Sequence, residues 1–128
     1  MDKEKDEKNV KQQNQPSAVR PDLAEVISRH AFTLDENRPD MVAKRKEKNQ
    51  RTARANVLDI CDEGSFIEYG ALAIAAQRGR RKLDDLLVKT PADGMIAGVG
   101  SVNGSLFTAD KARCMVLAYD YSVLAGPQ

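Results

Sequence analysis

The chain has 128 residues and a formal net charge of +1, because its 20 Lys and Arg side chains almost balance its 19 Asp and Glu side chains. This length supports one domain at most. No apolar run approaches the roughly 20 residues that cross a bilayer, and residues 1–15 contain no apolar region typical of a secretion signal. We therefore expect a cytoplasmic protein without a membrane partner.

Sulfur and imidazole ligands are scarce in this sequence. Cys61 and Cys114 are the two cysteines, and they lie far apart without CxxC spacing, which favours reduced thiols over a disulfide or metal framework. His30 is the single histidine, which argues against a zinc site. We expect no metal ligands and no covalently bound cofactor.

Residues 1–20 predict a disordered tail. The stretch mixes charged side chains with Gln, Asn and Pro, and its few apolar residues are Val10, Ala18 and Val19 beside the initial Met. Such a composition cannot bury enough surface to offset the entropy cost of ordering the chain.

Residues 21–64 predict a helical segment that begins with an amphipathic helix. From Asp22 onward, apolar side chains recur at three- and four-residue steps as far as Leu34, and His30 lies on the same face. Asp22 fits the N-cap position, with Glu25 as its capping partner.

A second helix is expected from Pro39 to about Cys61. Its predicted apolar stripe consists of Ala53, Val57, Ile60 and Cys61. Gly64 is the expected stop, since glycine commonly follows the last turn of a helix.

Residues 65–128 predict a β layer. The ranges 65–69, 95–102 and 112–119 have strand-like patterns, and Asn103-Gly104 is a strong turn signal between the last two. Leucines within 83–87 predict one or two helical turns before Pro91. The order of helices followed by strands indicates the α+β class.

Residues 38–54 form a basic run with seven basic and two acidic side chains. Lys44, Lys48 and Arg51 would share one face of a continuous helix, where they could bind phosphates together with Arg54. The alternatives are a solvated helix face, a phosphorylated small molecule or nucleic acid. Nucleic acid is disfavoured because no aromatic side chains interleave with the basic ones.

The sequence contains no catalytic constellation. Asp84 and Asp85 are adjacent, so on a helix they point in different directions and cannot act as an acid/base pair. Ser65 lies outside any GxSxG pattern and fits a turn. Gly98 and Gly100 precede a strand rather than a helix, which excludes a dinucleotide fingerprint and favours close backbone approach in a hairpin.

From Leu34 to the last residue, the sequence resembles the start of a carboxyltransferase subunit of the biotin-dependent acyl-CoA carboxylases. The most specific pieces are QRTARANV and DEGSFIEYG, similar to the family's TAREN…D.GSF.E opening, followed by PADGMIAGVGSVNG and YDYSVLAG. Together, in this order and at natural spacing, these pieces are a strong match, whereas none alone would be.

The resemblance implies an incomplete crotonase-like fold, in which N-terminal helices are followed by the first strands of a ββα unit. It also implies transfer of a carboxyl group from carboxybiotin, carried on a partner domain, to acetyl-CoA, propionyl-CoA or a related acyl-CoA. The implied partners are the biotin carboxyl carrier and biotin carboxylase components, within a homo-oligomer of the parent subunit.

The same resemblance implies site residues for CoA. Lys48, Arg51 and Arg54 lie at or near the TAREN-like motif and are expected to face the CoA phosphates, and Ala125 and Gly126 are expected to line the acyl-CoA site. No catalytic residue is expected within this chain.

Several positions depart from the family pattern. Ala55 replaces the Glu of TAREN, and Pro127 stands where Thr or Ser is expected. Because the family's Gly-Gly turn lies further downstream, residues 65–128 are expected to be the truncated start of the carboxyltransferase N-domain, inactive alone and with exposed apolar strand faces. The alternative is a small binding or assembly protein whose basic helix docks on intact carboxylase subunits or an anionic partner.

Overall fold

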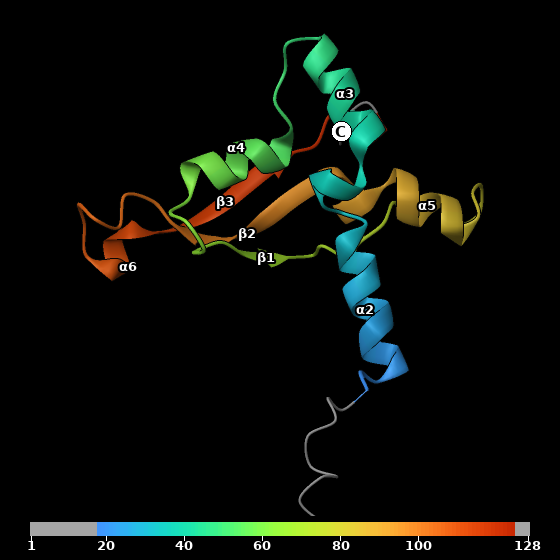
Figure 1. Ribbon diagram of the computed structural model, residues 1–128, viewed down its shortest axis with the longest axis horizontal. Helices are drawn as coiled ribbons and strands as arrows, with labels where there is room; N and C mark the ends of the chain where they lie inside the picture. Colours follow the sequence, from blue (N-terminus) through green and yellow to red (C-terminus); the bar gives the residue numbers. More distant parts are fainter. Residues whose placement is uncertain (1–17, 125–128) are drawn as a thin grey trace, which may run out of the picture.

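The computed structural model describes residues 18–124 and shows short helices arranged around a small sheet (Figure 1). In chain order the elements are α2 (Pro21–Ala31), a 3₁₀ turn (Asp35–Asn37), α3 (Pro39–Glu47), α4 (Ala53–Ile60), β1 (Ile67–Tyr69), α5 (Leu83–Lys89), a second 3₁₀ turn (Pro91–Gly94), β2 (Met95–Ser101), α6 (Ala109–Ala112) and β3 (Arg113–Tyr119). The predicted mixture of helices and strands is confirmed. Most of the expected tail, residues 1–17, lies outside the described residues.

The sheet contains three antiparallel strands in the order β1-β2-β3. In the central strand, Val99 lies opposite Ile67 of β1 and Met115 of β3. Each strand is shorter than expected by one or two residues at its ends. Asn103 has a φ of 54°, as a turn at Asn-Gly requires, but the connection from β2 to β3 is longer than a tight hairpin and contains α6, which was not predicted.

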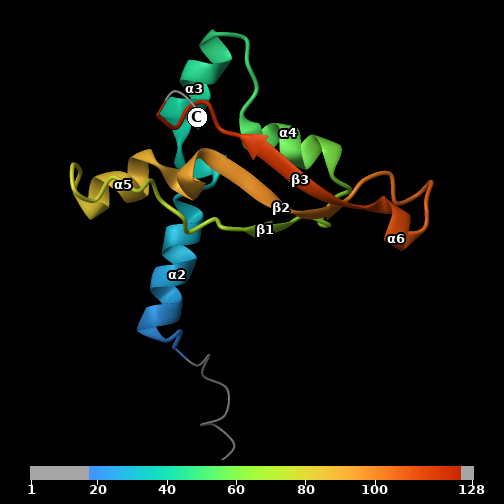
Figure 2. The same cartoon turned by 180° about the vertical axis from the view of Figure 1, so that it is seen from behind.

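Helix α4 covers one face of this sheet (Figure 1, and from behind in Figure 2). Its Val57 and the following Cys61 are buried against Ile96 of β2, and four partly buried side chains complete this core: Ala53, Phe66, Val116 and Ala118. Ile60, expected in the same stripe, is 56% exposed, so that part of the prediction is wrong. The helix presents a narrower apolar stripe than expected.

Two glycines of β2 allow the close packing on the covered face. A Cβ atom on Gly98 would lie 2.2 Å from the carbonyl oxygen of Ile67, and one on Gly100 would lie 2.7 Å from Cys61 Sγ. Real Cβ atoms do not approach other heavy atoms this closely, so the predicted close backbone approach is confirmed.

The free thiol of Cys61 has a raised pKa. Burial is the main cause, and the nearby Asp62 and Cys114 add to it.

The capping predicted for the first helix is wrong. Arg20 occupies the N-cap without a side-chain hydrogen bond, and Pro21 is the first helical residue, a position where the missing N–H costs nothing. Asp22 accepts hydrogen bonds from the Arg20 side chain and the Leu23 N–H instead of capping with Glu25.

Helix α2 ends at Ala31, before Leu34, and its apolar face is not buried within the described residues. Val26 and Ile27 are 42% and 54% exposed, and His30 is exposed beside them. Both views show α2 extending away from the sheet (Figures 1 and 2). Within residues 18–124, no helix combines the length and apolar character needed to cross a bilayer.

The single helix expected from Pro39 to about Cys61 is two helices, α3 and α4. Between them Asn49 adopts the left-handed conformation, with a φ of 55°, that commonly terminates helices. Arg45 stabilises the break by donating to the carbonyl oxygen of Arg51 at 3.0 and 2.8 Å. Thr52 then caps α4, because its Oγ1 accepts a hydrogen bond from the Ala55 N–H at 3.0 Å.

This break corrects two predictions. Lys44, Lys48 and Arg51 do not share one continuous helical face, since Lys48 directly follows α3 and Arg51 lies in the connecting segment. Gly64 is not the helix stop, because α4 ends at Ile60 and Gly64, with a φ of 70°, belongs to the turn before β1.

The opposite face of the sheet carries large apolar side chains that the described residues leave uncovered. These side chains are 56% to 64% exposed: Ile67, Tyr69, Met115, Leu117 and Tyr119. They share one face because the paired registers place them on alternate positions from the residues under α4. The expected exposure of an apolar strand face is confirmed, and we call this surface the open face.

Candidate functional site

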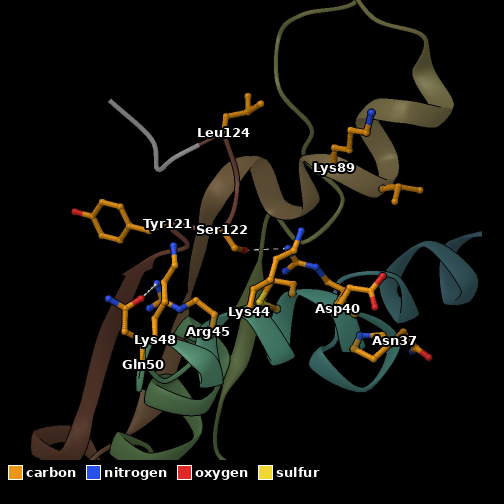
Figure 3. A pocket seen from close by; sticks show the side chains of 14 residues that line it. Asn37, Asp40, Lys44, Arg45, Lys48, Gln50, Lys89, Tyr121, Ser122 and Leu124 are labelled. Atoms are coloured by element: carbon orange, nitrogen blue, oxygen red, sulfur yellow. Dashed lines mark hydrogen bonds between the residues drawn. The ribbon is translucent and has the colours of Figure 1, made fainter.

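A pocket of about 560 Å³ lies between α3, the end of α5 and the segment that follows β3 (Figure 3). This volume falls within the range of roughly 300–1,000 Å³ typical of small-molecule sites. Apolar surface is supplied by Met41 of α3, Val88 of α5, and Tyr121 and Leu124 after β3. The pocket is therefore built from segments that lie far apart in the sequence.

Positive charge dominates the lining of this pocket. The lining contains one acidic residue, Asp40, and five basic residues: Arg38, Lys44, Arg45, Lys48 and Lys89. Within residues 18–124, Lys44 and Lys48 make no ion pair, and Lys89 pairs only loosely with Asp85 across 3.8 Å. Three ammonium groups are thus available to an anionic ligand, and phosphate groups fit this charge.

Two arginines of the lining are held by protein groups. Arg45 donates to Gln50 Oε1 at 2.9 Å and to the carbonyl oxygen of Arg51, which fixes the connection after α3. Arg38 donates to Asp120 Oδ2 at 3.0 Å and to Ser122 Oγ at 3.1 Å. These arginines shape the walls of the pocket, whereas the lysines supply its unneutralised charge.

Asp120 is an ionised carboxylate in a largely buried position. Burial alone raises its pKa, but hydrogen bonds from Ser122 and Arg38, together with the charge of Arg38, outweigh burial and hold the pKa below its ordinary value. The ion pair therefore stabilises the fold at neutral pH. That contribution is lost as the pH falls below about 4 and through the lowered pKa.

The structure separates the residues predicted to bind CoA. Lys48 lines the pocket, whereas Arg51 and Arg54 are not among its lining residues. Arg51 forms an exposed ion pair with Asp59 at 3.1 Å. Ala125 and Gly126 lie outside the described residues and directly follow Leu124, which does line the pocket.

Arg54 contacts the protein rather than the pocket. Its guanidinium donates to both carboxylate oxygens of Glu68, at 2.7 and 2.9 Å, and its Nε donates to the carbonyl oxygen of Thr33. The Arg54 and Glu68 side chains are only 12% and 13% exposed. Arg54 thereby ties α4 to β1 and to the residues after α2.

Lys89 and Tyr121 were not predicted as site residues. No local pattern marks them, because Lys89 is an ordinary last-turn lysine and Tyr121 follows a strand. Only the packing of α5 and the β3 end beside α3 brings them to the pocket.

The remaining motifs have structural roles or exposed positions. Ser65 Oγ donates to the carbonyl oxygen of Asp62 at 2.7 Å and accepts from the Ser101 N–H at 3.0 Å, which confirms its predicted turn role. Asp84 and Asp85 are exposed on α5. Among the described residues, no three His, Cys, Asp or Glu side chains gather in a way that could hold a metal ion.

Comparison with solved structures identifies a similar segment in a much longer protein. Over 87% of its length, the chain matches part of a single-chain, multi-domain long-chain acyl-CoA carboxylase, with 58% sequence identity and a TM-score of 0.83. The predicted resemblance to the acyl-CoA carboxylases is confirmed. The matched segment amounts to 11% of that carboxylase chain.

Two structures of transcarboxylase 12S share the same fold. One, with methylmalonyl-CoA and methylmalonic acid bound, matches 87% of the chain at 20% identity with a TM-score of 0.58. The other, with hydrolysed methylmalonyl-CoA bound, matches 86% at 22% identity with a TM-score of 0.60. The chain spans 20% of each of these proteins. No protein-family model and no curated protein matches the chain.

Proposed function

We propose that this chain forms part of an acyl-CoA carboxyltransferase, which moves a carboxyl group from carboxybiotin to an acyl-CoA of the acetyl- or propionyl-CoA type. The observation that carries the proposal is the 58% identity to a segment of a long-chain acyl-CoA carboxylase. In this proposal residues 21–64 are the N-terminal helical segment and residues 65–128 begin a crotonase-like domain. Biotin carboxyl carrier and biotin carboxylase components are the proposed partners of a homo-oligomeric parent enzyme.

The contribution proposed for this chain is to bind the phosphate groups of CoA in the basic pocket. Lys44, Lys48 and Lys89 supply positive charge there, and Met41 and Tyr121 offer apolar surface for the less polar parts of the ligand. Ala125 and Gly126 are proposed to continue the lining beyond Leu124.

Arg51 and Arg54 have different places in this proposal. Arg51 is proposed to assist at the periphery, since its exposed ion pair with Asp59 is weak and exchangeable. Arg54 is assigned the structural role of holding Glu68, because withdrawing its guanidinium would leave a buried carboxylate unpaired.

A calorimetric titration of CoA into the 128-residue chain tests the proposal. Lys48→Ala is expected to weaken saturable binding about tenfold, the effect of losing one charge-assisted contact of about 1.4 kcal/mol. Lys46→Ala is the matched control, because Lys46 lies on the same helix and does not line the pocket. Binding is also expected to weaken between low and moderate salt. Absence of saturable binding by a chain shown to be folded would contradict the proposal.

The expectation that the chain alone transfers no carboxyl group stays a prediction. It is tested by incubating the purified chain with carboxybiotin and acetyl-CoA or propionyl-CoA. Formation of malonyl-CoA or methylmalonyl-CoA above the rate without protein would contradict it.

A second candidate function, docking on carboxylase subunits, is favoured by the open face. The similar carboxylase chain is far longer than the matched segment, so other parts of that polypeptide are available to cover the equivalent face. Co-sedimentation of this chain with a purified carboxyltransferase tests this function. Loss of binding on Leu117→Lys, with no loss on Lys46→Ala, would support docking through the open face.

A further inference from the structure

A buried ion pair joins the start of α3 to the segment that follows β3. Arg38, the residue before α3, contacts Asp120 Oδ2 through Nη1 and Ser122 Oγ through Nη2. The side chains of Arg38 and Asp120 are only 12% and 11% exposed. Arg38 and Ser122 both line the basic pocket, and Asp120 directly precedes Tyr121, another lining residue.

Asp120 is fixed by the backbone as well as by Arg38. Its N–H donates to the carbonyl oxygen of Gly94 at 2.8 Å, which anchors it next to the start of β2. Its Oδ1 accepts from both the N–H and the hydroxyl of Ser122, and its carbonyl oxygen accepts from the Val123 N–H at 3.0 Å. The main chain and the carboxylate of Asp120 together hold the segment that leaves β3.

Helix α3 has few other attachments to the rest of the described structure. None of its residues is buried. Among the side-chain hydrogen bonds within residues 18–124, those of Arg38 are the ones that connect the start of this helix to residues 120–124. The Arg38 guanidinium is thus the side-chain link between the start of the helix that carries Lys44 and the segment after β3.

We infer that Arg38 and Asp120 are positioning residues for the pocket: their ion pair, extended by Ser122, holds the α3 wall against the wall formed by residues 121–124. Arginine suits this task because its planar fork contacts a carboxylate and a hydroxyl at once, whereas a lysine ammonium has no such fork. The two residues act through the walls that they hold. Only the choice of CoA as the ligand rests on the proposed function.

A single tryptophan provides a readout of the wall itself. The chain contains no Trp, so Tyr121→Trp introduces one fluorescent reporter at an exposed position that lines the pocket. In this background, Asp120→Asn removes the charge and keeps the shape. Glu68→Gln is the matched control, since Arg54 and Glu68 form an equally buried ion pair outside the pocket lining.

Asp120→Asn is expected to shift the tryptophan emission and to change its quenching by acrylamide, with a loss of CoA affinity of about tenfold. Glu68→Gln is expected to leave the tryptophan emission, the quenching and the CoA affinity unchanged. Asp120→Asn and Glu68→Gln should both keep the circular dichroism of a folded chain. Arg38→Lys should give an intermediate result, because it keeps the charge and loses the contact with Ser122.

Two outcomes separate this inference from the proposed function. If the chain binds no CoA but Asp120→Asn alone alters the tryptophan signal, the proposed ligand is wrong and the positioning role stands. If Asp120→Asn and Glu68→Gln change the signal equally, the positioning role is overturned. If Asp120→Asn unfolds the chain, Ser122→Ala replaces it as the test, because this substitution removes one hydroxyl and keeps the ion pair. Ser122→Ala is then expected to shift the tryptophan signal. An unchanged signal in Ser122→Ala would also overturn the positioning role.

Discussion

The two faces of the sheet are built from different kinds of residue. The face under α4 contains Ala118 and two glycines, Gly98 and Gly100, which leave room for Phe66 and Cys61. Its one large fully buried side chain is Ile96. The open face carries larger side chains: Tyr69, Met115, Leu117 and Tyr119.

This difference shows which face of the sheet is covered by other parts of the described structure. Small residues favour a sheet face that a neighbour packs closely against, and Phe66 and Cys61 pack in this way on the covered face. Large apolar side chains on an exposed sheet face mark a surface for contact with other polypeptide. Stability of this chain should therefore depend on the covered face and hardly at all on the open one.

The largest expected effect comes from the ion pair that joins α4 to β1. Arg54→Met leaves the Glu68 carboxylate buried without its partner, which we expect to lower the free energy of unfolding by about 3–5 kcal/mol. Urea unfolding followed by circular dichroism measures the change. Arg51→Met, at an exposed pair, serves as the control and should change stability little. An equally small effect of both substitutions would contradict the structural role of Arg54.

A second test adds one methyl group to the covered face. Gly98→Ala places a Cβ atom against the Ile67 backbone and the Phe66 ring, so we expect a loss of about 1–3 kcal/mol as β1 and β2 are pushed apart. Ala97→Val enlarges the neighbouring residue on the open face and should leave the urea midpoint nearly unchanged. If the two variants unfold at the same urea concentration, the faces do not differ as the structure indicates.

Much of this fold could be predicted because its signals are local. Short, mostly apolar runs located β2 and β3, and the leucines before Pro91 located α5. The break between α3 and α4 was missed because residues 48–52 contain no Gly or Pro. That break depends on Asn49 in a left-handed conformation, since Asn is a weaker stop signal than Gly. It also depends on Arg45 donating to the carbonyl oxygen of Arg51, a contact that no local sequence pattern shows.

The candidate site was less predictable than the fold. The basic run pointed to Lys48 because charge is visible in composition, but the run does not reveal which side chains are already paired. Arg54 is engaged by Glu68, which lies in the next element along the chain. Lys89 reaches the pocket through tertiary packing alone. The local sequence therefore predicts where basic side chains gather along the chain, but it does not predict which of them line the pocket.

A modest gain in stability is expected from restoring a carboxylate at the start of the covering helix. Thr52 is the N-cap of α4, and Ala55 occupies the third helical position, where a Glu side chain can reach back to the Thr52 N–H. Ala55→Glu should raise the free energy of unfolding by about 0.5–1 kcal/mol. Ala55→Gln isolates the hydrogen bond from the charge and should give a smaller gain in a thermal melt. No gain from either variant would show that the helix start is already satisfied.

The smallest expected effect is the most direct test of the two faces, since Val116 and Leu117 are neighbours on β3 that point in opposite directions. Leu117→Thr should change the free energy of unfolding by less than about 0.5 kcal/mol, because its side chain is 63% exposed. Val116→Thr keeps the shape of the side chain but places a hydroxyl among the core residues under α4, which should cost about 1–3 kcal/mol. Leu117→Thr should also reduce self-association in sedimentation velocity, because it removes apolar surface from the open face. Equal destabilisation by the two substitutions would mean that the isolated chain buries the open face as well, so the two faces would no longer differ in what covers them.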